Sequence, residues 1–144
     1  MELVFKRVEL NEDNIYKLEY ARYDAYSMLS LEIPCNQSFC ANELRKKKYI
    51  AYAAYLDDEI IGGCYVSNAH KLYIEQLFVK KKYQSLHVGR TLLAFTLHNK
   101  EEIEKYFNET YDYSFLSTRS NKLNKYYEEL GYKNVDDIYM KKHL

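Results

Sequence analysis

Three apolar segments of strand length follow one another closely, and they constrain the fold more than any other feature of the chain. They span residues 49–56, 60–67 and 71–79. The connections between them are short and polar, with Asp57-Asp58 in the first and Asn68-Ala69 in the second. Because connections this short join antiparallel neighbours, the sequence predicts a three-stranded antiparallel meander.

Helical periodicity flanks the meander. Apolar residues from Ile15 to Met28 recur every three or four positions, and they predict a helix from Asn11 or Asp13 to about Leu29. The other expected elements are a strand at 3–10, a short helix at 38–47, a long helix that begins at 87 or 88 and keeps an apolar face to Tyr106, a strand at 113–118, a helix at 121–130 and a strand at 138–142.

The predicted order is therefore β-α-α-β-β-β-α-β-α-β, in a single domain over residues 1–144. This order is typical of a mixed α/β fold with a central, mostly antiparallel sheet flanked by helices. The helical crossover between the strands at 71–79 and 113–118 predicts that these two strands are parallel neighbours.

Single residues add detail to this expectation. Gly62-Gly63 indicates a bulge or a close approach to the backbone. Phe39 and Leu44 are expected to face inward from the short helix. Ser120 can cap the helix at 121–130, and Gly131 can end it, because glycine adopts a left-handed conformation without strain.

Composition excludes several classes of protein. Lys and Arg number 21, as do Asp and Glu, so bulk charge recruits neither nucleic acid nor a membrane surface. The spacing of Cys35, Cys40 and Cys64 fits neither a zinc site nor a disulfide framework, and we expect reduced, buried thiols. Neither a signal peptide nor a membrane span is recognisable, so we expect a cytoplasmic protein.

Residues 72–95 carry the clearest chemical signal. A strand ends at Val79, a polar stretch follows, and a helix begins near Val88 with Gly89 in its first turn. The free amides of a helix start carry partial positive charge, and glycine lets a phosphate approach the backbone closely. The segment therefore predicts a site for a pyrophosphate.

This segment resembles the cofactor motif of the GNAT acetyltransferase superfamily, Arg/Gln-x-x-Gly-x-Gly/Ala after an aliphatic strand end. The matching residues run from Gln84 to Gly89, with His87 in the first glycine position. The family also commonly ends its last helix in Leu-Tyr-x-Lys-x-Gly-Phe. The chain has Tyr-Tyr-Glu-Glu-Leu-Gly-Tyr at 126–132, which places Tyr127 at the family's aromatic position.

The resemblance implies direct transfer of an acyl group, usually acetyl, from acetyl-CoA to a primary amine, without a metal. It implies that the exposed edge of the central strand bonds the pantetheine arm and that the following amides hold the pyrophosphate. The implied cofactor-binding residues are Leu77, Phe78, Val79, Gln84, Ser85, Leu86, His87, Val88, Gly89, Arg90 and one of Asn121 and Asn124.

Two residues are candidates for proton transfer. By the resemblance, Tyr127 donates a hydrogen bond or proton to the leaving thiolate, because a phenol is neutral at pH 7. Glu75 is the candidate base, acting directly or through water, since it shares a strand face with Leu77 and Val79. Tyr73 lies on the same face and is a candidate substrate contact.

The acceptor stays open among polyamines, aminoglycoside-like drugs, amino acids and protein N-termini, and a homodimer is common in the family. One alternative is a non-catalytic acyl-CoA-binding sensor or interaction module, which would keep residues 77–90 without needing Tyr127 or Glu75. A nucleotide-binding α/β domain would have a parallel sheet and an early glycine-rich loop, and a structural protein would use Gly89 only for packing.

Overall fold

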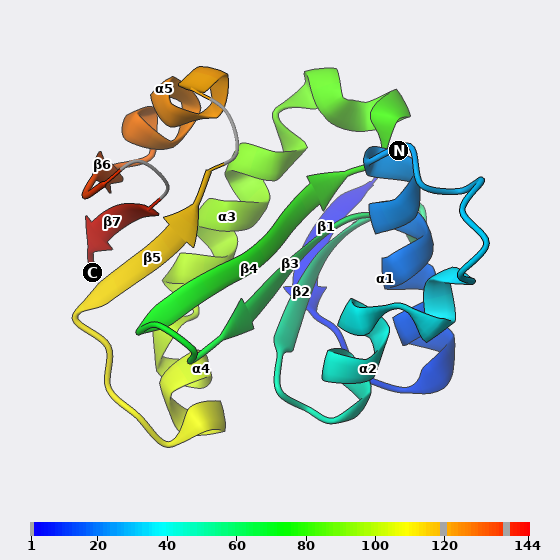
Figure 1. The fold of residues 1–144 in the computed structure, drawn as a ribbon, viewed down its shortest axis with the longest axis horizontal. Coiled ribbons are helices and arrows are strands. Elements are labelled where there is room, and N and C mark those ends of the chain that lie inside the picture. Colours follow the sequence, from blue (N-terminus) through cyan, green and yellow to red (C-terminus); the bar gives the residue numbers. More distant parts are fainter. Residues whose placement is uncertain (1, 119–120, 137–138) are drawn as a thin grey trace.

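The computed structural model describes residues 2–118, 121–136 and 139–144, and these form one sheet flanked by helices (Figure 1). The sheet order is β1-β2-β3-β4-β5-β7-β6. The strands are β1 (Leu3–Arg7), β2 (Ile50–Leu56), β3 (Glu59–Ser67), β4 (Leu72–Val79), β5 (Tyr113–Ser117), β6 (Lys133–Asn134) and β7 (Tyr139–His143). All neighbours are antiparallel except β4 and β5, which are parallel.

Five α-helices and two short 3-10 helices are found in the described residues. They are α1 (Glu12–Ala25), η1 (Cys35–Gln37), α2 (Phe39–Arg45), η2 (Lys81–Leu86), α3 (Val88–His98), α4 (Lys100–Phe107) and α5 (Asn121–Glu129). The predicted meander and the predicted parallel crossover between β4 and β5 are confirmed, and with them the mixed, mostly antiparallel fold.

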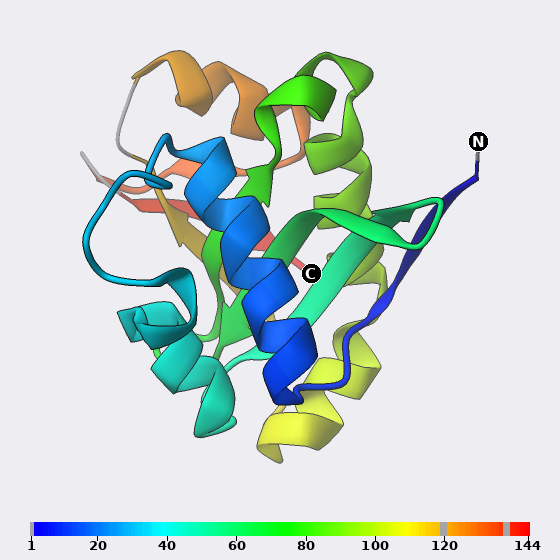
Figure 2. The same cartoon turned by 90° about the vertical axis from the view of Figure 1, so that its right-hand side faces the viewer.

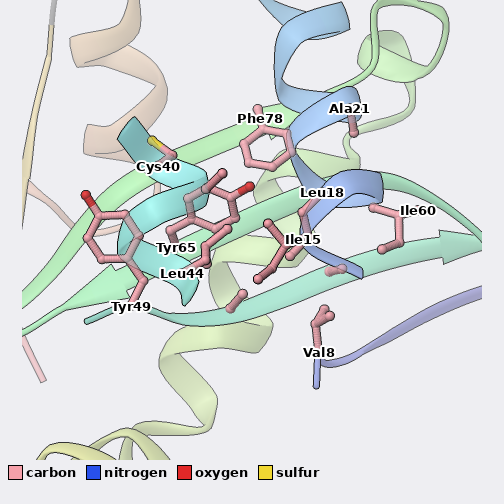
Figure 3. Packing of buried hydrophobic residues seen from close by; sticks show 13 residues of the cluster. Val8, Ile15, Leu18, Ala21, Cys40, Leu44, Tyr49, Ile60, Tyr65 and Phe78 are labelled. Carbon is pink, nitrogen blue, oxygen red and sulfur yellow. The ribbon is translucent and has the colours of Figure 1, made fainter. Parts of the chain in front are cut away.

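The two faces of the sheet bury separate groups of side chains. Alternation along β2 shows this, because Ala51 and Ala53 pack with α1 and α2, whereas Ile50 and Tyr52 pack with α3 and α4. Figure 2 shows α1 lying across one face of the sheet, with α3 and α4 on the other. Figure 3 shows the first cluster, in which α1 packs over the rings of the two central strands.

The glycine pair in β3 confirms the predicted close approach. A Cβ atom on Gly62 would lie 2.8 Å from the Phe78 carbonyl oxygen, and one on Gly63 would lie 2.5 Å from the Phe78 ring. The β2–β3 register also shifts between Ala54 and Tyr55, opposite this part of β3. The missing side chains let the outer end of the Phe78 ring approach the backbone of β3.

Several element boundaries differ from the predictions. The first helix ends at Ala25 rather than near Leu29, and the predicted long helix breaks at Asn99, whose side chain donates to the Phe95 carbonyl oxygen. The prediction for Phe39 was wrong: this residue is 72% exposed, because it occupies the first position of α2 on the outer side, whereas Leu44 is buried as predicted.

The C-terminal part is partly as predicted. Gly131 has a φ of 96° after α5, the left-handed conformation that its position predicted. The predicted cap Ser120 and the predicted strand start Ile138 lie outside the described residues. The two-residue strand β6 was not predicted, since Lys133 and Asn134 are polar and exposed.

All three cysteines are buried free thiols, as expected. Burial raises the pKa of Cys64 to about 12, so that sulfur stays protonated. Within the described ranges, no helix combines the length and the apolar character that crossing a membrane would require.

Candidate functional site

The site begins where β4 and β5 separate. Their parallel pairing ends at Ile74 and Leu116, whereas the pairing of β4 with β3 continues to Val79. Figure 1 shows the ends of β4 and β5 diverging, with α5 beside the end of β5. The edge of β4 that faces β5 is therefore unpaired with any described strand over residues 75–79, and the Leu77 and Val79 carbonyl oxygens accept side-chain bonds from Tyr26 and Gln84 instead.

A cavity of about 360 Å³ lies over this edge. Its lining combines the end of β4, the start of α3, the end of α1 and one face of α5. The lining residues are Ala25, Tyr26, Leu77, Phe78, Val79, Gln84, His87, Gly89, Leu123, Tyr126 and Tyr127. The structure thus brings together both segments that the sequence analysis singled out, 77–89 and 126–127.

The start of α3 differs from the starts of α1 and α2. Asn11 accepts from the Asn14 amide and Ser38 from the Ala41 amide, so α1 and α2 each have a capping side chain. No described side chain caps α3. The first amide bonded within α3 is that of Thr91, which donates to the His87 carbonyl oxygen. The amides of Val88, Gly89 and Arg90 therefore precede the helical ladder and favour an anion.

His87 explains the shape of this helix start. Its backbone has φ 57° and ψ 23°, a left-handed conformation. Glycine adopts that conformation without strain, which gives a physical reason for glycine at this position of the motif. The polar stretch before it is a 3-10 helix rather than an open loop.

Gly89 lies tightly against the cavity wall. A Cβ atom at this position would lie 3.3 Å from the Tyr126 hydroxyl oxygen and 3.5 Å from Val79 Cγ2. A side chain here would fill the space between the helix start and α5, so glycine keeps the amides accessible from the cavity.

Two predicted cofactor-binding side chains are engaged within the protein. Gln84 Nε2 donates to the Val79 carbonyl oxygen at 2.9 Å, which ties η2 to the end of β4. Arg90 Nη2 pairs with Glu129 Oε2 at 2.6 Å, and its guanidinium lies 5.7 Å from the centre of the Tyr126 ring. Arg90 thus joins α3 to α5 across the cavity wall.

A second cavity, of about 590 Å³, adjoins the first. The two share Tyr26, Leu77, Leu123 and Tyr127 in their linings. The second cavity is lined in addition by Arg22, Met28, Ile74, Glu75, Gln76, Leu116 and Ser117. It is the more polar of the two and lies at the point where β4 and β5 part.

Glu75 contributes a carboxylate to the second cavity. Its Oε2 accepts a hydrogen bond of 2.6 Å from Ser67 Oγ. Burial raises the pKa of Glu75; the Ser67 bond opposes the rise, and the nearby Glu43 carboxylate adds to it. A half-buried carboxylate with a raised pKa is a stronger proton acceptor than a solvated one. Tyr73 does not line either cavity, and its hydroxyl donates to Ser117 Oγ at 3.0 Å.

Tyr127 faces both cavities from α5. Its ring packs edge-on against Tyr126 and Tyr132, with centroid distances of 5.2 Å and 6.3 Å. Burial raises the pKa of Tyr127 well above its usual value, with smaller contributions from Tyr26, Tyr126 and Cys64. The phenol therefore stays protonated and can donate a hydrogen bond.

Other predicted residues lie beside the cavities rather than in their linings. Leu86 is exposed, and Val88 is buried under α3 against Val79. Ser85 belongs to η2, and Asn124 Oδ1 is buried without a hydrogen-bond partner among the described residues. The side chain of Asn121 lies outside the described residues.

Sequence reasoning missed several lining residues, among them Arg22, Tyr26 and Leu123. Arg22 and Tyr26 come from the end of α1 and the residue after it, and a helical pattern does not show which cavity its last turn reaches. Leu123 is 44% exposed despite being apolar, and this exposure is visible only in the folded structure.

Comparisons with known proteins agree with this fold. A family model described as an acetyltransferase (GNAT) domain matches residues 31–144. No curated protein sequence matched the chain. Among solved structures, the PaiA N-acetyltransferase of Thermoplasma acidophilum, in complex with coenzyme A, is similar with a TM-score of 0.67 and 19% identity over 100% of both chains.

Two further solved structures are similar over nearly their whole length. An aminoglycoside 6′-N-acetyltransferase complexed with coenzyme A has a TM-score of 0.75 and 15% identity, covering 97% of this chain and 96% of its own. PH1933 from Pyrococcus horikoshii OT3 has a TM-score of 0.73 and 19% identity, covering 99% of each chain. At these identities the likeness concerns the fold.

Proposed function

The chain belongs to the GNAT acetyltransferase family, and from this premise we propose that it transfers the acetyl group of acetyl-CoA to a primary amine by direct attack. One observation carries the proposal. The cavity beside the uncapped start of α3 and the cavity that contains Glu75 share Leu77 and Tyr127. A thioester that entered through the first cavity would therefore meet an amine in the second.

The residues present fit acetyl-CoA. The strand-free edge of β4 at Leu77–Val79 offers backbone groups at strand spacing for the pantetheine amides, and the Leu77 and Val79 carbonyls there are bonded by the side chains of Tyr26 and Gln84. The amides that open α3 have no capping side chain among the described residues and are suited to an anion, and Gly89 leaves their approach free. We assign the pyrophosphate to these amides, and Gln84 supports them by fixing η2 against Val79.

In the proposed reaction, the amine nitrogen attacks the thioester carbonyl carbon, a C–N bond forms and the C–S bond breaks. Glu75 accepts the proton that the amine loses, directly or through water, because burial raises the pKa of its carboxyl. Tyr127 donates to the sulfur that leaves as thiolate. A backbone amide of β4 stabilises the oxyanion, since the unpaired edge presents such donors.

The first experiment titrates the protein with acetyl-CoA and with coenzyme A by calorimetry and then assays thiol release with a panel of amines. We expect binding of both compounds and amine-dependent thiol release. Gly89→Glu should abolish binding, because its side chain would meet Tyr126 and bring a negative charge to the phosphates.

A matched control is Gly131→Glu, which also replaces a glycine next to α5 but lies outside both cavities. If it remains folded, it should bind acetyl-CoA as the unmodified protein does. Binding without turnover on any amine would favour the non-catalytic sensor module. Undiminished binding by a folded Gly89→Glu variant would contradict the placement of the cosubstrate.

A further inference from the structure

Arg22 brings a buried positive charge to the wall of the second cavity. It lies in the last full turn of α1, its side chain is 10% exposed, and it lines the same cavity as Glu75. The reaction proposed above gives this charge no task, because it assigns the oxyanion to a backbone amide of β4 and the leaving sulfur to Tyr127.

A buried partner holds the guanidinium in one orientation. Arg22 Nε and Nη2 donate to the two carboxylate oxygens of Glu19, both at 2.8 Å. Glu19 is 0% exposed, and it also accepts bonds of 2.5 Å from Ser38 and 2.7 Å from Tyr65. Four hydrogen bonds thus fix the Glu19 carboxylate on the inner side of Arg22. Because this carboxylate holds one edge of the guanidinium, the guanidinium cannot turn away from the cavity.

The other edge of the guanidinium is available. Nη1 makes no hydrogen bond to any residue that the structure describes, and it is not among the fully buried polar atoms. Although burial favours the neutral form, bonds to Glu19 keep the pKa of Arg22 above its usual value, so the group is charged. A planar, charged donor on a cavity wall matches a carboxylate.

Apart from Arg22, the described lining of this cavity carries one carboxyl group, that of Glu75, among uncharged side chains. Glu75 lies on β4, and Glu43 is near enough to raise the pKa of Glu75. The cavity therefore offers a cationic position at Arg22 and an anionic one at Glu75. An acceptor with an amine and a carboxylate would satisfy both, whereas an acceptor with amines alone would leave Arg22 Nη1 without a hydrogen-bond acceptor, although Nε and Nη2 stay paired with Glu19.

On the basis of the proposed acetyl transfer, we infer that the acceptor is an amine that also carries a carboxylate, as an amino acid does, and that Arg22 binds this carboxylate while Glu75 faces the amine. This narrows the open acceptor classes to small zwitterions. It excludes polyamines and aminoglycosides as preferred acceptors, because both lack a carboxylate.

The test compares matched acceptors. Each of a panel of amino acids is assayed beside its own carboxamide, which keeps the amine and the side chain and removes only the negative charge. Thiol release from acetyl-CoA gives kcat/KM for each compound. We expect the free acids to be preferred roughly tenfold or more, because a carboxamide would leave Arg22 Nη1 without a carboxylate to bind.

A variant protein separates recognition from amine reactivity. Arg22→Gln alone would leave Glu19 buried without its ion pair and endanger folding, so Glu19→Gln is combined with it. The double variant should bind acetyl-CoA normally and lose the preference for the free acids. For each protein, the preference is the ratio of kcat/KM for the acid to kcat/KM for its amide. Differences in intrinsic reactivity between acid and amide cancel when this ratio is compared between the unmodified protein and the double variant.

The matched control is Glu12→Gln with Arg45→Gln. It removes the exposed ion pair between α1 and α2, at 2.8 Å, which lies outside both cavities. This control should keep the preference. Equal use of acids and amides by the unmodified protein would overturn the inference and leave acetyl transfer standing. Acetyl transfer to simple amines, with none to any amino acid, would also overturn the inference. Failure to bind acetyl-CoA would instead reject the proposed function itself.

Discussion

The hydroxyl of Tyr26 donates a hydrogen bond of 3.2 Å to the carbonyl oxygen of Leu77. This carbonyl lies on the unpaired edge of β4 that we assign to the pantetheine arm. Tyr26 also lines both cavities, so its side chain stands where the cosubstrate and acceptor sides meet. The residue is positioned to compete with the cosubstrate for a backbone acceptor and must move for that acceptor to be used.

Tyr26→Phe should therefore tighten acetyl-CoA binding, by about two- to fivefold, since the exposed bond that it removes is a weak one. Calorimetric titration measures the change. Tyr20→Phe is the control, because Tyr20 is on the same helix, is 40% exposed and lines neither cavity. Weaker binding by Tyr26→Phe would mean that the hydroxyl contacts the cosubstrate instead of competing with it.

His87 carries backbone strain at the start of α3, with its φ of 57°. His87→Gly should raise the thermal unfolding midpoint by about 2 °C, because relief of left-handed strain outweighs the entropy that glycine adds to the unfolded chain. His87→Ala keeps the Cβ atom and should bring no such gain. Calorimetric unfolding of both variants separates strain from side-chain effects. Equal midpoints for the two variants would show that the strain is negligible.

Glu75 should set the acidic limb of the pH–rate profile. Because burial raises the pKa of Glu75, kcat/KM should fall as the pH drops through that raised value and recover above it. Glu75→Gln should remove this limb and lower turnover roughly a hundredfold. Glu43→Gln is the matched control: it removes a carboxylate that raises the pKa of Glu75, and so should move the limb to lower pH. A limb unchanged in Glu75→Gln would exclude Glu75 as the base.

The same pKa shift predicts the effect of Glu75 on stability. The folded protein holds the Glu75 proton more tightly than the unfolded chain, whose carboxyl has a pKa near 4.5. This contribution is complete below that value and is lost as the pH rises through the raised pKa. Glu75→Gln should therefore unfold at a higher temperature than the unmodified protein at pH 7, but not below pH 4.5. A higher midpoint only in acid would contradict the shift.

The sequence predicted the features that depend on local pattern. Short polar turns fixed the meander, a helical crossover fixed the parallel pair, and Ser38 and Gly131 lie at the helix boundaries that they were expected to mark. The break at Asn99 escaped prediction because the apolar spacing resumes at Ile103 after this one polar residue, and the structure shows that the Asn99 side chain bonds the Phe95 carbonyl oxygen where α3 ends.

The site was predictable only in part, for a physical reason. Residues 77–89 and 126–127 carry motif spacing, and the structure brings them to one cavity. Arg22 and Tyr26 reach the site through tertiary packing alone. Tyr26 meets Leu77 across 51 positions of sequence, a contact that no periodicity encodes. The orientation of Arg22 likewise depends on Tyr65 of β3 and Ser38 before α2, which hold Glu19 behind it.

Tyr127 and its neighbour Tyr126 provide a matched pair for testing the proton donor. Both line the first cavity on α5, their rings are 5.2 Å apart, and only Tyr127 also lines the cavity of Glu75. Tyr127→Phe should lower kcat by roughly a hundredfold and leave the affinity for acetyl-CoA nearly unchanged, because the lost hydrogen bond acts on the departing thiolate and not on the bound thioester.

Tyr126→Phe should show the reverse pattern. Its hydroxyl lies against the space in front of Gly89, so its loss should alter acetyl-CoA affinity more than kcat. Steady-state kinetics and calorimetric titration of the two variants distinguish the roles. Because burial raises the pKa of Tyr127, the unmodified enzyme should also keep its activity to about pH 10, the usual pKa of a tyrosine. An unaltered kcat in Tyr127→Phe would leave the thiolate to be protonated by solvent, and Tyr127 would then be a packing residue between Tyr126 and Tyr132.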